Sequence, residues 1–192
     1  MSRRITFEFD ARRFVTAAAY LVERCPDVTK MKLSKLLYYV DKAHLLTYGK
    51  PVTGDRYVKM DFGPVPSAGY NLMKHNDWSP VEDQALFDQH LSVSGNDITL
   101  AKLPNLRCLS ETNKEVLEAV IAKYGHLTSA QLSKLSHHEP AWRTAEINGP
   151  MDYRLFFEES DDSLKDLVEQ DQELRDALSD IEFEEVLESL RP

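Results

Sequence analysis

The sequence predicts an α+β fold that is predominantly helical, with helices packed around a small antiparallel β-sheet. Residues 31–48 carry apolar side chains at three- and four-residue spacings, which is the period of one helix face. Two β-type runs, 86–93 and 98–102, flank a polar, glycine-containing turn and predict a hairpin. A third β-type run, 56–61, is expected to add one strand to the same sheet.

Each expected helix is marked at one end by a residue that suits that position. Gly49 ends the helix over 31–48, and Pro66 suits the first turn of a short helix that follows. A short helical segment around Trp142 ends at Asn148-Gly149-Pro150. Starts are expected at Asp10, for a helix over 11–24, at Thr29, and at the capping boxes Thr112-x-x-Glu115 and Thr128-x-x-Gln131.

The composition excludes several classes of protein. The chain has 192 residues, 42% hydrophobic and 29% charged, which fits one globular core of ordinary size. No apolar run approaches the ~18 residues that span a bilayer, and the N-terminal segment lacks the apolar block of a secretion signal. Two cysteines, Cys25 and Cys108, do not make a disulfide framework, so we expect a cytoplasmic protein.

Negative charge is concentrated at the C-terminus. Residues 158–192 contain 14 acidic and 3 basic residues, a net charge of −11. The rest of the chain contains 18 acidic and 20 basic residues, a net charge of +2, and the two parts account for the totals of 32 and 23. Apolar residues recur at helical spacing within the acidic part. We therefore expect one domain over 1–157 and an acidic amphipathic helical tail over 158–192.

The sequence leaves two interpretations of the tail open. It forms a solvated helix face that keeps the protein soluble, or it packs against a surface that belongs to its own domain, to a second copy in a homodimer, or to a basic partner. Phosphate backbones require clustered Lys and Arg, so the overall charge argues against binding of nucleic acid.

Two segments carry an ordered set of motifs. The first, from Lys32 to Tyr70, reads K-L-x-K-L-L-Y-Y, then an H-L pair, Y-G-K-P, a strand, and G-P-V-x-x-x-x-Y. The second, from Leu132 to Ala145, reads L-S-x-L-S-H-x-E-P-A-W-x-x-A. Together they resemble the SocA-like antitoxin domain, also called the Panacea domain, over roughly residues 10–157.

The resemblance implies a function. Proteins with this domain are typically antitoxins of bacterial or prophage toxin–antitoxin systems, which neutralise a cognate protein toxin by direct binding. We expect no enzyme activity and no cofactor, because the sequence contains no G-x-S-x-G, G-x-x-x-x-G-K-[ST] or G-x-G-x-x-G motif. An alternative within the family is an adaptor that delivers the toxin to a protease. The residues expected to bind the partner are Tyr38, Tyr39, His44, Phe62, Gly63, Pro64, Val65 and Trp142.

The aromatic residues of the motifs suggest where a partner docks. Tyr38 and Tyr39 are adjacent, so a helix cannot turn both toward one core, and we expect one of them to face a groove or a neighbour. Exposed tyrosines suit protein interfaces. His44 lies on an apolar stripe, where a buried histidine bonded to backbone or to a tyrosine is the ordinary interpretation.

The sequence gives less support to a metal site, a DNA-binding site or a hydrolase active site. His137-His138-Glu139 does not make a metal site, because adjacent helical side chains point apart and no C-x-x-C or H-x-x-x-H partner is present. A DNA-binding regulator needs a recognition helix with an outward face of Arg, Lys, Asn or Gln, and residues 129–134 offer only Gln131 and Lys134. A small hydrolase using His44 with a tyrosine needs a pocket with a perturbed titratable group. These two classes stay as alternatives.

Overall fold

The structure is a computed structural model that describes residues 5–158. The expected acidic tail therefore lies outside the described residues, except for Glu158. The helices are α1 (Ala11–Arg24), α2 (Lys30–Tyr48), α3 (Ser67–Lys74), α4 (Val81–His90), α5 (Glu111–Tyr124), α6 (Ser129–Ser136) and α7 (Pro140–Thr144), with short 3-10 turns η1 (Leu106–Cys108) and η2 (Tyr153–Phe157). The strands are β1 (Tyr57–Met60), β2 (Gly63–Pro66), β3 (Leu91–Ser94) and β4 (Asp97–Leu100).

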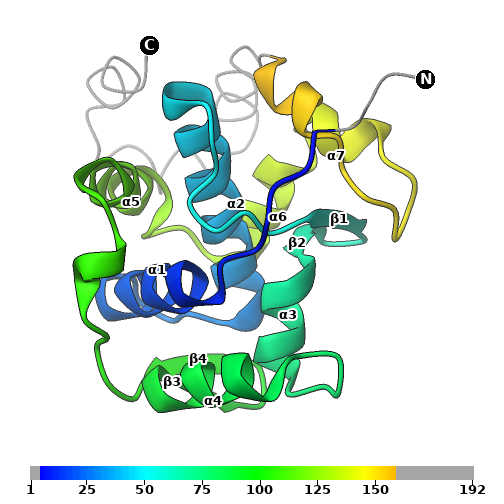
Figure 1. Cartoon of the computed structure of the whole chain (residues 1–192). Coiled ribbons are helices and arrows are strands. Elements are labelled where there is room, and N and C mark those ends of the chain that lie inside the picture. The colour runs from blue at the N-terminus through cyan, green and yellow to red at the C-terminus, as the bar shows by residue number, and fades with distance from the viewer. Residues whose placement is uncertain (1–4, 159–192) are drawn as a thin grey trace.

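Helix α2 lies at the centre of the fold, as Figure 1 shows, with α1, α5 and α6 packed around it. Its side chains are buried along most of its length, not along one stripe alone. Thr29 caps its start, where Oγ1 accepts from the backbone N–H of Lys32 at 3.1 Å. Gly49 ends it with a left-handed φ of +74°. The predicted α+β, mostly helical fold and the central position of this helix are confirmed.

The strands do not form the single sheet that was expected. Among the described residues, β1 pairs with β2 and β3 pairs with β4, in two separate antiparallel sheets. Gly63-Pro64-Val65 therefore belongs to a strand, not to a rigid bend after a lone strand. The stretch 86–90, expected as strand, forms the end of α4. That helix follows Pro80 and carries Glu82 and Asp83 in its first turn, where carboxylates interact favourably with the helix dipole.

The second edge of β1 is also covered. The backbone N–H of Lys59 donates to the carbonyl oxygen of Gly149 at 3.0 Å, and the N–H of Asn148 donates to the carbonyl oxygen of Lys59 at 2.8 Å. An isolated bridge joins Val58 to Pro150. Strand β1 is thus held between β2 and the loop that follows α7.

The predicted caps at Asp10 and Thr128 are confirmed. The capping box at Thr112 is wrong. Helix α5 begins earlier, because the extended Ser110 accepts from the N–H of Asn113 at 3.2 Å and the Asn113 side chain bonds back to the Ser110 N–H at 3.0 Å. Within residues 5–158, none of the helices is both long enough and apolar enough for a bilayer crossing.

Candidate functional site

The hairpin formed by β1 and β2 carries Phe62 in its turn. This side chain is 65% exposed, whereas the β2 residues that follow it, 63–66, are buried. Ser133 on α6 donates a hydrogen bond from Oγ to the carbonyl oxygen of Phe62 at 2.9 Å. Helix α6 therefore fixes the backbone of the turn while the aromatic ring stays in solvent.

Gly63 allows the hairpin to pack closely against its neighbours. Its φ is +100°, a conformation that favours glycine. A Cβ at this position would lie 2.3 Å from Oγ of Ser136 and 2.9 Å from Cε of Lys35. Both the backbone conformation and the lack of space therefore require glycine here.

Lys35 of α2 lies beneath the hairpin. The residue is 1% exposed, and its Nζ donates to the carbonyl oxygen of Pro64 at 2.8 Å. No carboxylate pairs with this amine within the part of the chain that the structure describes. Burial lowers the pKa of Lys35 to about 7. The hairpin thus rests on a buried amine that has no ionic partner among residues 5–158.

Trp142 of α7 fixes the end of β1. Its indole Nε1 donates to the carbonyl oxygen of Met60 at 3.1 Å, and its ring stacks on His137 with ring centroids 4.1 Å apart. The ammonium of Lys59 lies 4.4 Å from the Trp142 ring centroid, a cation–π contact. Burial lowers the pKa of His137, which favours a neutral imidazole in this stack. The half-buried Trp142 therefore joins α6, α7 and β1.

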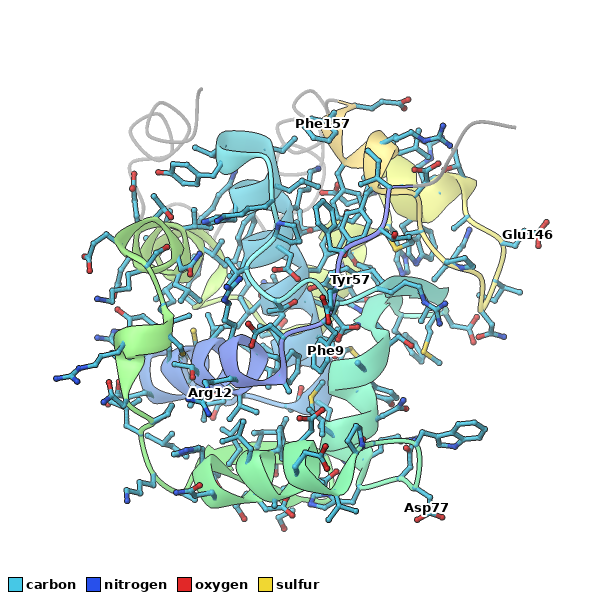
Figure 2. The ribbon with its side chains drawn as sticks, in the orientation of Figure 1. Phe9, Arg12, Tyr57, Asp77, Glu146 and Phe157 are labelled. Atoms are coloured by element: carbon cyan, nitrogen blue, oxygen red, sulfur yellow. The ribbon has the colours of Figure 1, made fainter. Side chains whose placement is uncertain are left out.

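A third element reaches the same region. Ile147 is 55% exposed and lies in the loop that pairs with the outer edge of β1. Figure 2 labels the adjacent Glu146 on this loop. We use the term hairpin face for the surface formed by Lys59, Phe62, Trp142, Arg143 and Ile147.

The family described as antitoxin SocA-like, Panacea domain, matches residues 33–143, which is more than half of the chain. The chain belongs to this family. No curated protein and no solved structure matches it. The matched region spans α2, the β1–β2 hairpin and α6, and it ends in α7 at Arg143. All residues of the hairpin face except Ile147 lie within it.

The two motifs of the Panacea domain meet in its core. Glu139, which precedes α7, accepts a hydrogen bond from the hydroxyl of Tyr38 at 3.2 Å and forms an ion pair with Lys42. Both partners lie on α2, and Glu139 is 5% exposed. Separating Glu139 from Lys42 would leave a buried charge without its partner, which is costly. The ion pair therefore holds Glu139, and with it the start of α7, against α2. The second motif is in this way held against the first.

The expectation that one of the two adjacent tyrosines faces outward is wrong. Tyr38 is fully buried and Tyr39 is 6% exposed. Tyr39 stacks on Tyr124 of α5 with centroids 4.3 Å apart, while Tyr38 makes edge contacts with Tyr57 and Phe156 at 5.3 and 5.2 Å. Both rings are buried because other elements cover α2 on more than one side.

His44 is a buried link between elements, as its ordinary interpretation predicted. The amide nitrogen of Asn113 donates to Nε2 at 2.9 Å, so Nδ1 carries the proton and donates to the carbonyl oxygen of Lys50 at 2.6 Å. Burial lowers the pKa of His44, which fits a neutral ring. The imidazole ties α2 to α5 and to the turn that follows α2.

The predicted partner-binding residues thus divide into two groups. Phe62 and Trp142 lie on the hairpin face with Gly63, Pro64 and Val65 buried in β2, whereas Tyr38, Tyr39 and His44 lie in the core. Sequence reasoning missed Lys59, Arg143 and Ile147. A usable signal was present at Ile147, which is an apolar residue within the otherwise polar turn 146–149.

Two buried carboxylates support the start of β1. Asp41 accepts from the N–H of Thr53 at 2.8 Å and from the hydroxyl of Tyr57 at 2.9 Å. Asp55 accepts from the N–H groups of Ala68 and Gly69 at 2.9 and 2.7 Å, at the start of α3. Burial raises the pKa of each carboxyl to about 6. Their oxygens are occupied by these structural contacts.

A polar depression of about 790 Å³ lies elsewhere, between the N-terminal segment and α4. Glu8, Asp10, Arg12, Glu82 and Asp83 contribute to its lining, and it contains neither buried carboxylate. Among residues 5–158, no cluster of three or more His, Cys, Asp or Glu side chains is arranged to hold a metal ion.

Proposed function

We propose that this protein is an antitoxin that neutralises a cognate protein toxin by binding it directly through the hairpin face. Membership of the antitoxin SocA-like family supports the class of function. The exposed Phe62, carried on a hairpin that α6 and α7 hold in place, is the observation that favours this surface.

The chemistry of the hairpin face suits protein recognition. Phe62 and Ile147 offer apolar contact area, and Trp142 contributes an aromatic edge that is already fixed by its hydrogen bond to Met60. Side chains held before binding lose little conformational entropy when a partner docks. Aromatic anchors of this kind dominate the affinity of interfaces that bury ~800 Å² on each partner.

In the proposed mechanism, the antitoxin neutralises the toxin by covering the toxin's active surface. A rigid body that covers the toxin's active surface blocks access of the toxin's substrate, and it needs no bond-making chemistry of its own. In this mechanism the buried residues of α2 act indirectly. Lys35 and Gly63 set the position of the hairpin, while Phe62 makes the contact.

Co-expression with the toxin encoded beside the gene tests the proposal. Wild-type protein is expected to restore growth, and Phe62→Asp is expected to lose rescue, because an unpaired carboxylate at the centre of an interface is costly to desolvate. Trp78→Asp is the matched control, since Trp78 is 84% exposed and lies in the loop between α3 and α4. Rescue by Phe62→Asp at the wild-type level, with both variants soluble and helical by circular dichroism, would contradict the proposal.

A further inference from the structure

Two clusters of exposed apolar side chains stand out on the described part of the protein. One is the hairpin face, with Phe62 at 65% and Ile147 at 55% exposure. The other joins Trp78 and Val81, at 84% and 83% exposure, in the turn between α3 and α4. In Figure 2 the labelled Asp77 and Glu146 mark the loops of the two clusters and lie well apart.

The surroundings of the two clusters differ in charge. Asp77, Glu82 and Asp83 lie beside Trp78 and Val81 in the sequence, and Lys74 is the nearest basic residue along the chain. Burial and the carboxylates of Glu82 and Asp10 raise the pKa of Asp83, which is consistent with a negative environment. An acidic segment is repelled from this cluster.

The segments that form the hairpin face contain more basic than acidic residues. Residues 56–66 and 129–150 contain the basic residues Arg56, Lys59, Lys134 and Arg143 and the acidic residues Asp61, Glu139 and Glu146. Glu139 is buried and its charge is matched by Lys42 of α2. The exposed part of these segments is therefore positive overall, with the carboxylates of Asp61 and Glu146 as its negative groups.

The chain itself contains a segment of the complementary kind. Residues 159–192, outside the described part, hold 13 acidic and 3 basic residues. Leu167, Leu174, Leu178 and Ile181 recur there at spacings of seven, four and three residues, the pattern of an amphipathic helix with one apolar face.

The end of the described chain lies next to the hairpin face. Turn η2, whose last residue is Phe157, packs against α7, the helix that carries Trp142 and Arg143 (Figure 1). The segment 159–192 therefore starts beside this surface. Even as a continuous helix, at ~1.5 Å per residue, it is long enough to extend across the face of a small domain.

We propose that the acidic segment 161–190 docks on the hairpin face of its own chain and covers it in the free protein. Its apolar residues cover Phe62 and Ile147, and its carboxylates face Arg143 and Lys59. A toxin that binds this face then competes with the segment for it. The competition rests on the proposed function, whereas the intramolecular contact does not.

Photo-cross-linking in the full-length chain tests the contact without any toxin. Phe62→p-benzoylphenylalanine places a photoreactive ring on the hairpin face, and Trp78→p-benzoylphenylalanine is the matched control on the acidic side. We expect about tenfold more cross-linking to segment 161–190 from position 62 than from position 78, because a docked segment has a high local concentration at one surface. The yield should not depend on protein concentration. It should fall at about 1 M salt, where the Debye length shrinks to ~3 Å.

A second pair of variants isolates the charge. Arg143→Glu in the position-62 protein is expected to reduce the cross-link severalfold, and Lys74→Glu is expected to leave it unchanged. Equal yields from positions 62 and 78, or no cross-link to the segment from position 62, would overturn the proposal. So would a yield that rises with protein concentration, since the segment would then come from a second copy. None of these results bears on whether the protein neutralises a toxin.

Discussion

At the scale of single residues, Lys35 is an unusual feature of the core, because its amine is buried beneath β2. A buried amine is normally paired with a carboxylate, yet this one bonds only to the carbonyl of Pro64 in the described structure. The hydrogen bond between Lys35 and Pro64 could not be predicted from the sequence, because the two residues are distant along the chain. What the amine provides is a donor directly under β2, where Gly63 leaves room for it.

The pKa of Lys35 predicts a pH dependence of stability. The folded value is about 7 and the ordinary value is 10.5. Between these values the unfolded chain binds more protons at this site than the folded chain, so the free energy of unfolding rises with pH, by at most about 1.4 kcal/mol per pH unit. Below pH 7 both states are protonated and the contribution is flat. Urea denaturation at a series of pH values from about 7 to 9 measures the slope.

Lys35→Met is the matching variant, because it keeps a long unbranched side chain and removes the amine. We expect it to lose this part of the pH dependence and to be more stable than wild type near pH 7. An identical slope in the two proteins would show that Lys35 titrates normally and that its amine is not buried.

At the scale of elements, local signals located α1, α2 and α6, but they missed α4, the start of α5 and the pairing of the strands. The cap at Thr29 and the stop at Gly49 act within one turn of the chain, so the ends of α2 could be predicted. Strand pairing depends on contacts between distant segments, and the pairing of β1 with the 148–150 loop has no sequence signature. Glycine and proline in 63–66 indicated a bend because they usually break strands. Here pairing with β1 and the hydrogen bond from the buried Lys35 to the carbonyl oxygen of Pro64 stabilise that stretch as a strand.

The hairpin should be sensitive to the loss of Gly63. Gly63→Ala introduces a Cβ at a φ of +100° and places it 2.3 Å from Oγ of Ser136. Gly95→Ala is the control, because Gly95 also has a positive φ, +60°, but a Cβ there meets nothing within 4 Å. The control should cost only the conformational term, roughly 1–2 kcal/mol of unfolding free energy.

We expect Gly63→Ala to cost at least about twice as much as Gly95→Ala and to reduce growth rescue, since the turn that carries Phe62 must move. Chemical denaturation compares the two proteins directly. Equal losses of stability would mean that the close packing of Gly63 against α2 and α6 is not a constraint.

At the scale of the whole molecule, the surface that we propose for recognition lies apart from the buried residues of α2. Helix α2 carries most of the motif residues and is covered on several sides, so Tyr38, Tyr39 and His44 act by positioning other elements. Exposed aromatic side chains include Phe62 on the hairpin, Trp78 in the α3–α4 turn and Phe157 in η2. Resemblance to the family therefore identified the scaffold well, whereas the choice of the proposed docking residues depends on exposure, which only the three-dimensional arrangement reveals.

The affinity of the full-length protein for its toxin, measured by calorimetry, tests this account most directly. Phe62→Ala should weaken binding at least about tenfold, or ~1.4 kcal/mol, because a central aromatic anchor is lost. Trp78→Ala, which removes an even more exposed ring from the other cluster, should leave the affinity within about twofold of wild type. Unchanged binding by Phe62→Ala, or an equal loss in both variants, would contradict the claim that the hairpin face is where the toxin docks.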